Sequence, residues 1–518
     1  MSVTADYDNM SFNDLLAEKV STLPERVFIV DGGIPYTWSD IEKGANIIAK
    51  DLAALGAGRR SHIALCGTNS AEWIMAFFAI QRLGAIALLL NPVLLAEDIG
   101  TDSRKADATY IVYGKMPAVS HDPCFFDILS DSSGIPARNM YPITGGIRER
   151  LNENCDIDAA DTKPDDVALM IFSSGTSGRP KGVLHSAYNI LSAAWINRID
   201  QRLSDDDRMC LILPLFHIFA LVAGLFAAAV ADSVIYIPDN LHARTLMQLI
   251  DREKCTVMHS VPTMLLRITG DKDYAPGMLS SLRQSIVAGA ALPVAQYRTL
   301  HDLLPDVTFR SSYGLSEMAP VTITSVRDDE EHIRTTVGRP IADIDIRIVD
   351  RETGEDKETN ESGEVLVKGH RLMTAYYKVP AGEQPLDGNG WLHTGDLGYL
   401  TDDGYLCLSG RIKDIIIRGG ENIIPSKVES AIAGIVGIRD VKVMGVASPL
   451  YGEEVAACIC FEDAGTFDIT SFKEELSGRL AKFMMPSYIE IYEAFPTLAN
   501  GKIDVKSLRQ DLEARLGI

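Results

Sequence analysis

The stretch "SSGTSGRPKGVLHS", residues 173–186, places four hydroxyl side chains, three glycines and one lysine within its first ten positions. Backbone N–H groups, hydroxyls and a lysine bind phosphate oxygens, and glycine lets the backbone approach them closely. The spacing is not that of a Walker A loop, because Pro180 stands where the second glycine would be and Gly182 follows Lys181 in place of Ser or Thr. The alternative is a flexible surface turn. The apolar run "VALMIF" before the stretch and the crowded hydroxyls favour phosphate binding.

The overall charge and the cysteines limit the partners of the chain. Of 518 residues, 71 are Asp or Glu and 49 are Lys or Arg, which gives a formal net charge of −22. This balance argues against nucleic acid as a partner, because a nucleic-acid-binding face must be basic. Eight scattered cysteines without metal-site spacing indicate a reducing, cytoplasmic setting. We expect Cys458 and Cys460, two apart in a strand, to be small buried residues.

Residues 209–231, "MCLILPLFHIFALVAGLFAAAVA", are long and apolar enough to suggest a membrane span. Pro214 and His217 interrupt the first half of this segment, and no basic cluster flanks it. We therefore expect a buried strand, turn and helix, and no transmembrane segment. The N-terminal residues contain early aspartates and lack the basic-then-apolar pattern of a signal peptide.

Strand-like and helix-like runs alternate along most of the chain. The segments "HIALCG" (62–67), "SAEWIMAFFAIQRLGA" (70–85) and "IALLLNP" (86–92) form one such unit, and "SVIYIP", "ARTLMQLIDREK" and "TVMHSVP" between 233 and 262 repeat the order. This rhythm is typical of an α/β fold with mostly parallel sheets. After about residue 340, short strands set off by turns predict antiparallel pairing. We expect a large N-terminal domain with several subdomains, 1–410, and a small α/β C-terminal domain, 411–518.

The stretch at 173–186 resembles the signature of the adenylate-forming superfamily, which includes acyl-CoA synthetases, adenylation domains and firefly-type luciferases. Further segments resemble the motifs of this superfamily in the same order, and they extend the resemblance from about residue 30 to the C-terminus. These segments are "LPLFH" (213–217), "VAGAALP" (287–293), "SYGLSE" (312–317), "GEVLVKG" (363–369), "WLHTGDLGYL" (391–400), "GRIKDIIIRGGENIIPSKVE" (410–429) and "PTLANGK" (496–502). Three departures are Ser316 in place of threonine, "AGAAL" in place of G-G-A-P-L, and Ala375 in place of glycine.

The resemblance implies a two-step reaction that uses ATP, Mg²⁺ and coenzyme A. A carboxylic acid attacks the α-phosphorus of ATP to give an acyl-adenylate and pyrophosphate, and a thiol then displaces AMP. The residues implied to bind ATP or AMP are Ser174, Gly175, Thr176, Ser177, Gly178, Lys181, Ala288, Gly289, Ala290, Ser312, Tyr313, Gly314, Ser316, Asp396 and Arg411.

The resemblance also assigns chemical roles to individual side chains. Glu317 and Thr176 would bind Mg²⁺, and the alternative for Glu317 is an ordinary exposed glutamate. Asp396 would accept both ribose hydroxyls, although an aspartate in a turn also caps its own backbone. Lys502 would place its charge beside the α-phosphate and the attacking carboxylate, where a solvated lysine is the alternative.

His217 is implied to border the acyl pocket as a third catalytic residue beside Lys502 and Glu317, and a hydrogen-bonded core histidine is the alternative. The implied acyl pocket consists of Phe216, His217, Ile218, Phe219, Leu221 and Met318. Residues 216–225 are mostly apolar and carry no charge to pair with an ammonium group. We therefore expect an apolar acid, either medium-chain, alicyclic or aryl.

The small domain is implied to be mobile. Rotation about Lys413 would exchange Lys502 for a thiol-tunnel loop of Gly419, Gly420 and Glu421. The leading prediction is an acyl-CoA synthetase. A stand-alone enzyme that loads a carrier-protein thiol is one alternative, and a non-catalytic nucleotide-binding relative is another. The oligomeric state is left open, with a homodimer among the alternatives.

Overall fold

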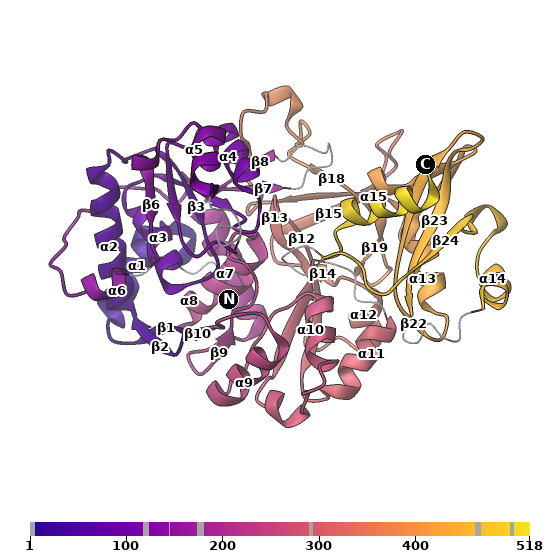
Figure 1. The fold of residues 1–518 in the computed structure, drawn as a ribbon, viewed down its shortest axis with the longest axis horizontal. Helices are drawn as coiled ribbons and strands as arrows, with labels where there is room; N and C mark the ends of the chain where they lie inside the picture. The colour runs from indigo at the N-terminus through magenta and orange to yellow at the C-terminus, as the bar shows by residue number, and fades with distance from the viewer. Residues whose placement is uncertain are drawn as a thin grey trace.

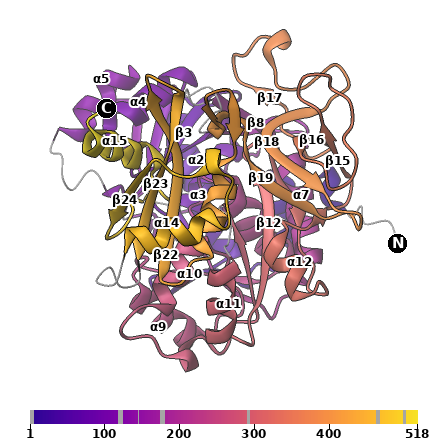
Figure 2. The same ribbon diagram turned by 90° about the vertical axis from the view of Figure 1, so that its right-hand side faces the viewer.

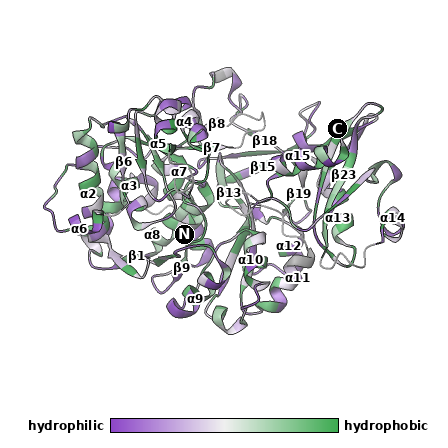
Figure 3. Cartoon of the chain, in the orientation of Figure 1, coloured by the Kyte–Doolittle hydropathy of each residue, from purple (hydrophilic) through white to green (hydrophobic). Residues whose placement is uncertain are grey.

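The structure is a computed structural model that describes residues 6–117, 124–144, 146–173, 181–289, 294–461, 468–497 and 502–518. Three sheets and their helices form the large N-terminal part of the molecule, and one five-stranded sheet with its helices forms the smaller C-terminal part, on the right of Figure 1. Apolar residues follow the strands and the inner faces of the helices, whereas outer turns are hydrophilic (Figure 3). The alternation predicted from the sequence is therefore present, and the fold is α/β.

The first sheet has seven strands in the order β17-β8-β7-β4-β3-β5-β6, and β7 to β6 run parallel. Its strands are β3 (His62–Cys66), β4 (Ile86–Leu90), β5 (Tyr110–Tyr113), β6 (Met140–Pro142), β7 (Val167–Ser173), β8 (Lys181–Ser186) and β17 (Ala375–Tyr376). The helices that accompany it are α1 (Phe12–Thr22), α2 (Trp38–Ala54), α3 (Ala71–Arg82), α4 (Ala96–Lys105), α5 (Phe125–Ser133), α6 (Ile147–Arg150) and α7 (Ala187–Gln201). Helix α3 is almost wholly buried, and the side chain of Ser70 caps its N-terminus.

The second sheet joins two four-stranded halves. The halves are β2-β1-β10-β9, from β1 (Val27–Asp31), β2 (Ile34–Thr37), β9 (Arg208–Cys210) and β10 (Val234–Ile237), and β11-β12-β13-β14, from β11 (Gln284–Ala288), β12 (Thr308–Leu315), β13 (Met318–Ile323) and β14 (Arg339–Pro340). Residues 256–262 were expected to form a strand, but they bridge the halves only through isolated pairs at Val257 and Ser260. The accompanying helices are α8 (Phe226–Ala231), α9 (Ala243–Glu253), α10 (Pro262–Thr269), α11 (Val294–Leu303) and α12 (Glu330–Thr335).

The segment with the length of a membrane span is buried inside the N-terminal part. It begins in β9, turns near Pro214 and continues through a π-helix at Ala220–Leu225 into α8. This order matches the predicted strand, turn and helix. Among the described residues, no helix has both the length and the apolar character needed to cross a membrane.

The third sheet is antiparallel, as predicted for the region after residue 340. It contains β15 (Ile344–Val349), β16 (Gly363–Gly369), β18 (Leu392–Leu400) and β19 (Leu406–Arg411) in that order. Strand β19 ends at Arg411, and a 3₁₀ turn at Ile412–Asp414 leads into the small C-terminal part. The last strand of this sheet therefore leads directly to the connection between the two parts.

The C-terminal sheet has the order β21-β20-β23-β22, and β24 also pairs with β23, in parallel. Its strands are β20 (Ile416–Arg418), β21 (Glu421–Ile423), β22 (Ile438–Ser448), β23 (Gly452–Phe461) and β24 (Tyr488–Tyr492), and its helices are α13 (Pro425–Ala433), α14 (Ile469–Ser477) and α15 (Val505–Leu516). Helices α13 and α14 pack on one apolar cluster and α15 on the other. Figure 2 shows this domain facing the viewer, with α14 and α15 at different places along its sheet. Cys458 and Cys460 are buried together beneath α15, as expected from their spacing.

Candidate active site

The carboxylate of Asp396 on β18 contacts one residue of β12 and one of β19. The Tyr313 hydroxyl donates to Asp396 Oδ2 at 2.6 Å, and Arg411 Nε lies 3.0 Å from Asp396 Oδ1. The sheet register places Asp396 directly opposite Arg411. Burial raises the pKa of the Asp396 carboxyl, and the Arg411 charge acts in the opposite direction. Because each carboxylate oxygen has a further lone pair, Asp396 retains the capacity to accept two hydroxyl donors such as a ribose diol.

A second carboxylate, Glu317, lies in the tight turn between β12 and β13. Its backbone carbonyl accepts a hydrogen bond from Met373 N at 2.8 Å, and its side-chain Oε1 accepts one from the Tyr376 hydroxyl. The Lys181 ammonium lies 4.7 Å from the centre of the Tyr376 ring. Burial and the Glu317 charge raise the pKa of Tyr376, so its hydroxyl stays protonated and can donate. The structure thus brings the predicted phosphate lysine and the predicted metal carboxylate to one tyrosine.

A buried histidine forms a hydrogen bond to the turn that contains Glu317. His185 of β8 donates from Nε2 to the carbonyl of Ser316 at 2.8 Å. Burial lowers the pKa of His185 to about 4, so the ring is neutral at physiological pH. The Ser312 hydroxyl is also engaged within the protein, because it donates to the Thr322 carbonyl at 2.9 Å, whereas Gly314 is exposed. His185 and Tyr376 were not singled out from the sequence, because their partners are distant along the chain.

Lys502 reaches into the N-terminal part of the molecule, where it lies against Gly289 at the end of β11. A Cβ atom added at Gly289 would lie 2.9 Å from Lys502 Cε and 3.2 Å from Nζ, and Gly289 has a φ of +82°. Glycine therefore suits this position for both its backbone angle and its lack of a side chain. Burial and, to a lesser extent, the Arg411 charge lower the pKa of Lys502. An isolated bridge pairs Thr497 with Ile503, the residue that follows Lys502.

His217 shares this environment. Burial, and then the positive charge of Lys502, lower the pKa of His217 to about 4. The imidazole is therefore neutral, and it lies beside Phe216 with 4.4 Å between ring centres. Lys502 therefore packs against Gly289, and its charge interacts with His217 and Arg411. These residues come from widely separated motifs.

The apolar residues predicted to line an acyl pocket divide between two packing clusters. Leu221 is fully buried in the cluster that contains α1, α2 and α3, together with Phe216 and Ile218. Met318 is fully buried in the cluster around β13, β16 and β18. Phe219 packs against both clusters and therefore lies where they meet. Leu221 and Met318 therefore serve as core packing, and Phe219 is the predicted pocket residue that lies between the two clusters.

The residues predicted to bind coenzyme A lie elsewhere on the small domain. Gly419 and Gly420 are exposed in left-handed conformations, with φ of +59° and +92°, and Glu421 begins β21 beside them. Gly419 N donates to the carbonyl of Tyr451 in the same domain at 2.8 Å. Lys413 is exposed in the 3₁₀ turn between β19 and β20. In this arrangement the small domain presents Lys502, not the glycine loop, to the N-terminal part.

Six of the predicted nucleotide-binding residues have no structural account. Ser174, Gly175, Thr176, Ser177, Gly178 and Ala290 lie outside the described residues. Within the described ranges, no group of three or more His, Cys, Asp or Glu side chains is arranged to hold a metal ion. A single carboxylate such as Glu317 fits Mg²⁺, which typically keeps several waters and is bound through one or two carboxylates plus the substrate's phosphates.

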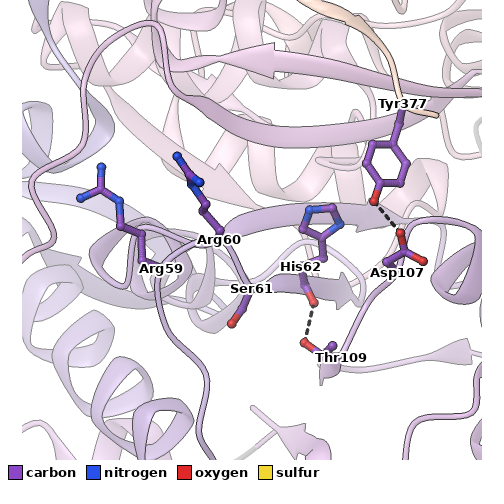
Figure 4. Close-up of a pocket in the computed structure, with 7 residues that line it drawn as sticks. All are labelled: Arg59, Arg60, Ser61, His62, Asp107, Thr109 and Tyr377. Atoms are coloured by element: carbon purple, nitrogen blue, oxygen red, sulfur yellow. Dashed lines mark hydrogen bonds between the residues drawn. The ribbon is translucent and has the colours of Figure 1, made fainter. Parts of the chain in front are cut away.

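A separate surface pocket of about 330 Å³ lies near the starts of β3 and β5. It is lined by Arg59, Arg60, Ser61, His62, Asp107, Thr109 and Tyr377 (Figure 4). None of these side chains was predicted to bind substrate. Tyr377 donates to Asp107 at 2.6 Å at the edge of this pocket. The pocket therefore does not coincide with the cluster of Asp396, Glu317 and Lys502.

Comparison with known proteins identifies the family of the chain. The profile described as AMP-binding enzyme matches residues 16–377, and the profile described as AMP-binding enzyme C-terminal domain matches residues 427–502. The chain is 30% identical to the long-chain-fatty-acid–CoA ligase FadD13 of Mycobacterium tuberculosis, over 93% of this chain and 94% of that protein. It is 28% identical to the medium-chain acyl-CoA ligase ACSF2 of Danio rerio, over 97% and 88% of the two chains.

Among solved structures, the crystal structure of ATP-bound MatB from Rhodopseudomonas palustris gives a TM-score of 0.86 at 24% identity, covering 96% of this chain and 98% of that one. The apo crystal structure of the same protein, with the same identity and coverage, gives 0.76. The overall geometry of this chain is thus more similar to the ATP-bound structure than to the apo one. The chain belongs to the AMP-binding enzyme family. It is an ATP-dependent acyl-CoA synthetase, whose reaction uses ATP, Mg²⁺ and coenzyme A.

Proposed function

We propose that the cluster around Asp396, Glu317 and Lys502 is the adenylation site of this synthetase. Asp396, oriented by Tyr313 and Arg411, would accept the ribose hydroxyls, and Lys181 would bind a terminal phosphate. The observation that carries the proposal is the position of Lys502 against Gly289 and His217, since this places a cation from the small domain inside the site of the large one.

The residue roles follow from where charge changes during the first step. The carboxylate of the acid forms a bond to the α-phosphorus while the bond to the pyrophosphate oxygen breaks. Lys502 faces this point, and a preorganised cation stabilises the negative charge that builds there. When bound, Mg²⁺ would neutralise charge on the phosphates, with Glu317 as its protein ligand. His217 is neutral, so it does not compete with Lys502 for the anionic groups.

The acid is proposed to be apolar. Phe219 lies where two apolar clusters meet, and the histidine next to Phe216 carries no charge at neutral pH. FadD13 and ACSF2 are named for long-chain and medium-chain acids, which agrees with this chemistry. We propose a medium-chain, alicyclic or aryl acid.

Two further features belong to the proposal. The boundary between the domains lies at residues 410–411, where β19 ends and the 3₁₀ turn containing Lys413 begins. We propose a cytoplasmic location, since seven of the eight cysteines are buried and none of the eight is in a disulfide within the described residues.

The test is ATP–pyrophosphate exchange across a panel of carboxylic acids, followed by AMP release with and without coenzyme A. We expect exchange that depends on an apolar acid and AMP release that depends on free coenzyme A. Replacing Lys502 by Ala should slow exchange about 10²–10³-fold, as for loss of one oxyanion donor. Thioester formation from preformed acyl-adenylate should continue in this variant. Equal loss of both half-reactions would refute the role given to Lys502.

A further inference from the structure

Tyr376 is the residue that connects the two predicted phosphate-side groups. Its hydroxyl donates to Glu317 Oε1, and its ring faces the Lys181 ammonium at 4.7 Å. No motif recognised in the sequence includes this tyrosine as a functional residue. We propose that Tyr376 is a positioning residue that orients the Glu317 carboxylate for Mg²⁺ and holds Lys181 beside it. The inference rests on the proposed role of Glu317.

The backbone of Tyr376 is fixed on both sides. On one side, β17 pairs with β8, with Tyr376 opposite Val183 and Tyr377 N bonded to the carbonyl of Gly182. On the other side, the amide of Gln384 both accepts from Tyr376 N at 2.9 Å and donates to Tyr376 O at 3.1 Å. A two-residue edge strand would otherwise leave these groups unpaired. The tyrosine therefore has a defined backbone position from which its side chain can orient another group.

The direction of the side chain follows from the pleat of the strand. Tyr376 shares an apolar cluster with Val183 and Met318, on the face that leads to Glu317. Lys181 precedes Val183 by two residues, so it lies on the same face as a diagonal neighbour of Tyr376. Tyr377 points to the opposite face, where it packs with the cluster of β3, β4 and α4 and donates to Asp107. The hydroxyl groups of both adjacent tyrosines thus donate to a carboxylate, but the carboxylates are different residues.

The hydrogen bond explains how Tyr376 would affect a metal ion that it does not touch. A donor to Oε1 fixes the rotation of the carboxylate, so that Oε2 keeps one orientation toward the phosphate side. Groups that orient a metal ligand in this way typically change metal affinity or activity by about 10–100-fold when they are removed. The ring contact with Lys181 is a separate effect, because it depends on the aromatic face and not on the hydroxyl.

The experiment compares Tyr376→Phe with Tyr377→Phe. Each variant loses one tyrosine-to-carboxylate hydrogen bond, but only the first loses the bond to Glu317. Binding of the unreactive analogue α,β-methylene-ATP is measured by calorimetry with Mg²⁺ and with EDTA, without acid or coenzyme A. The tightening that Mg²⁺ produces should fall about tenfold or more in Tyr376→Phe, with little change in EDTA. In Tyr377→Phe it should equal that of the native protein.

Two further variants separate the possible failures. Tyr376→Leu also removes the aromatic face, so analogue binding in EDTA should weaken in that variant alone. Glu317→Gln should remove the Mg²⁺ effect. If it does, but Tyr376→Phe keeps the native effect, the positioning role is wrong and the assignment of Glu317 stands. If Glu317→Gln itself keeps the native effect, the assignment of Glu317 is wrong, and the inference about Tyr376 is overturned with it.

Discussion

Burial sets the charge of the histidines around the site. His185, His217 and His259 each have a pKa lowered by burial, to about 4 for the first two and about 3 for the third. Each ring is therefore neutral in the folded protein near neutral pH. For His185 this neutrality has a structural use, because a neutral ring can donate one proton from Nε2 to Ser316 without placing a charge in the core.

These lowered pKa values predict acid sensitivity of the fold. An unfolded histidine titrates near 6.5. Between about pH 6.5 and 4 the unfolded chain binds more protons than the folded one, so the free energy of unfolding must fall as the pH falls. Each such histidine contributes at most about 1.4 kcal/mol per pH unit. Urea denaturation at several pH values should show a smaller slope for His185→Gln than for the native protein. Identical slopes in His185→Gln and the native protein would mean that His185 does not titrate as a buried neutral group.

The resemblance of the motifs singled out Asp396, Tyr313, Glu317 and Lys502 as candidate functional residues, and their roles remain a proposal. Their mutual contacts were not predictable, because the bond between Tyr313 and Asp396 spans 83 positions of sequence. Tyr376 was missed for the same reason, since it lies 59 positions from Glu317 and its importance depends on a pleat that a two-residue strand cannot reveal.

At the scale of elements, the pair β18 and β19 determines the position of the proposed ribose site. Gly398 allows the two strands to approach closely, because a Cβ atom there would lie 2.6 Å from the carbonyl oxygen of Cys407. Asp396 and Arg411 face each other on the same two strands. The contact between backbones therefore sets the distance between the two charged side chains.

Replacing Gly398 by Ala should push β19 away from β18. Overpacking of this kind typically costs about 1–3 kcal/mol in the free energy of unfolding. The same displacement should raise the KM for ATP more than the KM for the acid. Chemical denaturation and initial rates would measure the two effects. Gly388→Ala is the control, since a Cβ atom at Gly388 meets no atom within 4 Å. An unchanged KM for ATP in Gly398→Ala would show that the ribose site tolerates this shift.

The elements predicted from hydrophobic patterns were mostly correct, and the exception is instructive. Residues 256–262 have the composition of a strand, but they make only isolated bridges while Pro262 starts α10. The number of bridges that this segment makes depends on the strands on either side of it. These strands are distant in the sequence, so a local pattern does not describe them. Composition predicted that the segment is buried and extended, but not how it pairs.

At the scale of the whole molecule, the structure shows one arrangement of the two domains. Lys502 lies against Gly289 of the large domain, whereas Gly419 and Gly420 are exposed and Gly419 contacts Tyr451 of the small domain. If the loop of Gly419 and Gly420 lines the coenzyme A tunnel, coenzyme A must bind when the two domains are arranged differently. The connection at Ile412–Asp414 is the short segment about which the small domain would turn.

Replacing Lys413 by Pro should separate the two half-reactions. Proline fixes φ near −65°, which a 3₁₀ turn accepts, but it removes the freedom to rotate there. We expect adenylation to be nearly unchanged and thioester formation to be at least about tenfold slower, equivalent to about 1.4 kcal/mol in the barrier. Single-turnover measurements of pyrophosphate release and of acyl-CoA formation would show this. Native rates for both steps would place the rotation at another residue.

The lowered pKa of Lys502 also links substrate binding to solution protons. Burial and the Arg411 guanidinium disfavour the charged ammonium in the protein alone, whereas phosphates or a carboxylate beside it would favour that charge again. Any ligand that raises a pKa takes up protons when it binds near that pKa. Nucleotide binding at alkaline pH should therefore consume protons, and its calorimetric enthalpy should vary with the ionisation enthalpy of the buffer.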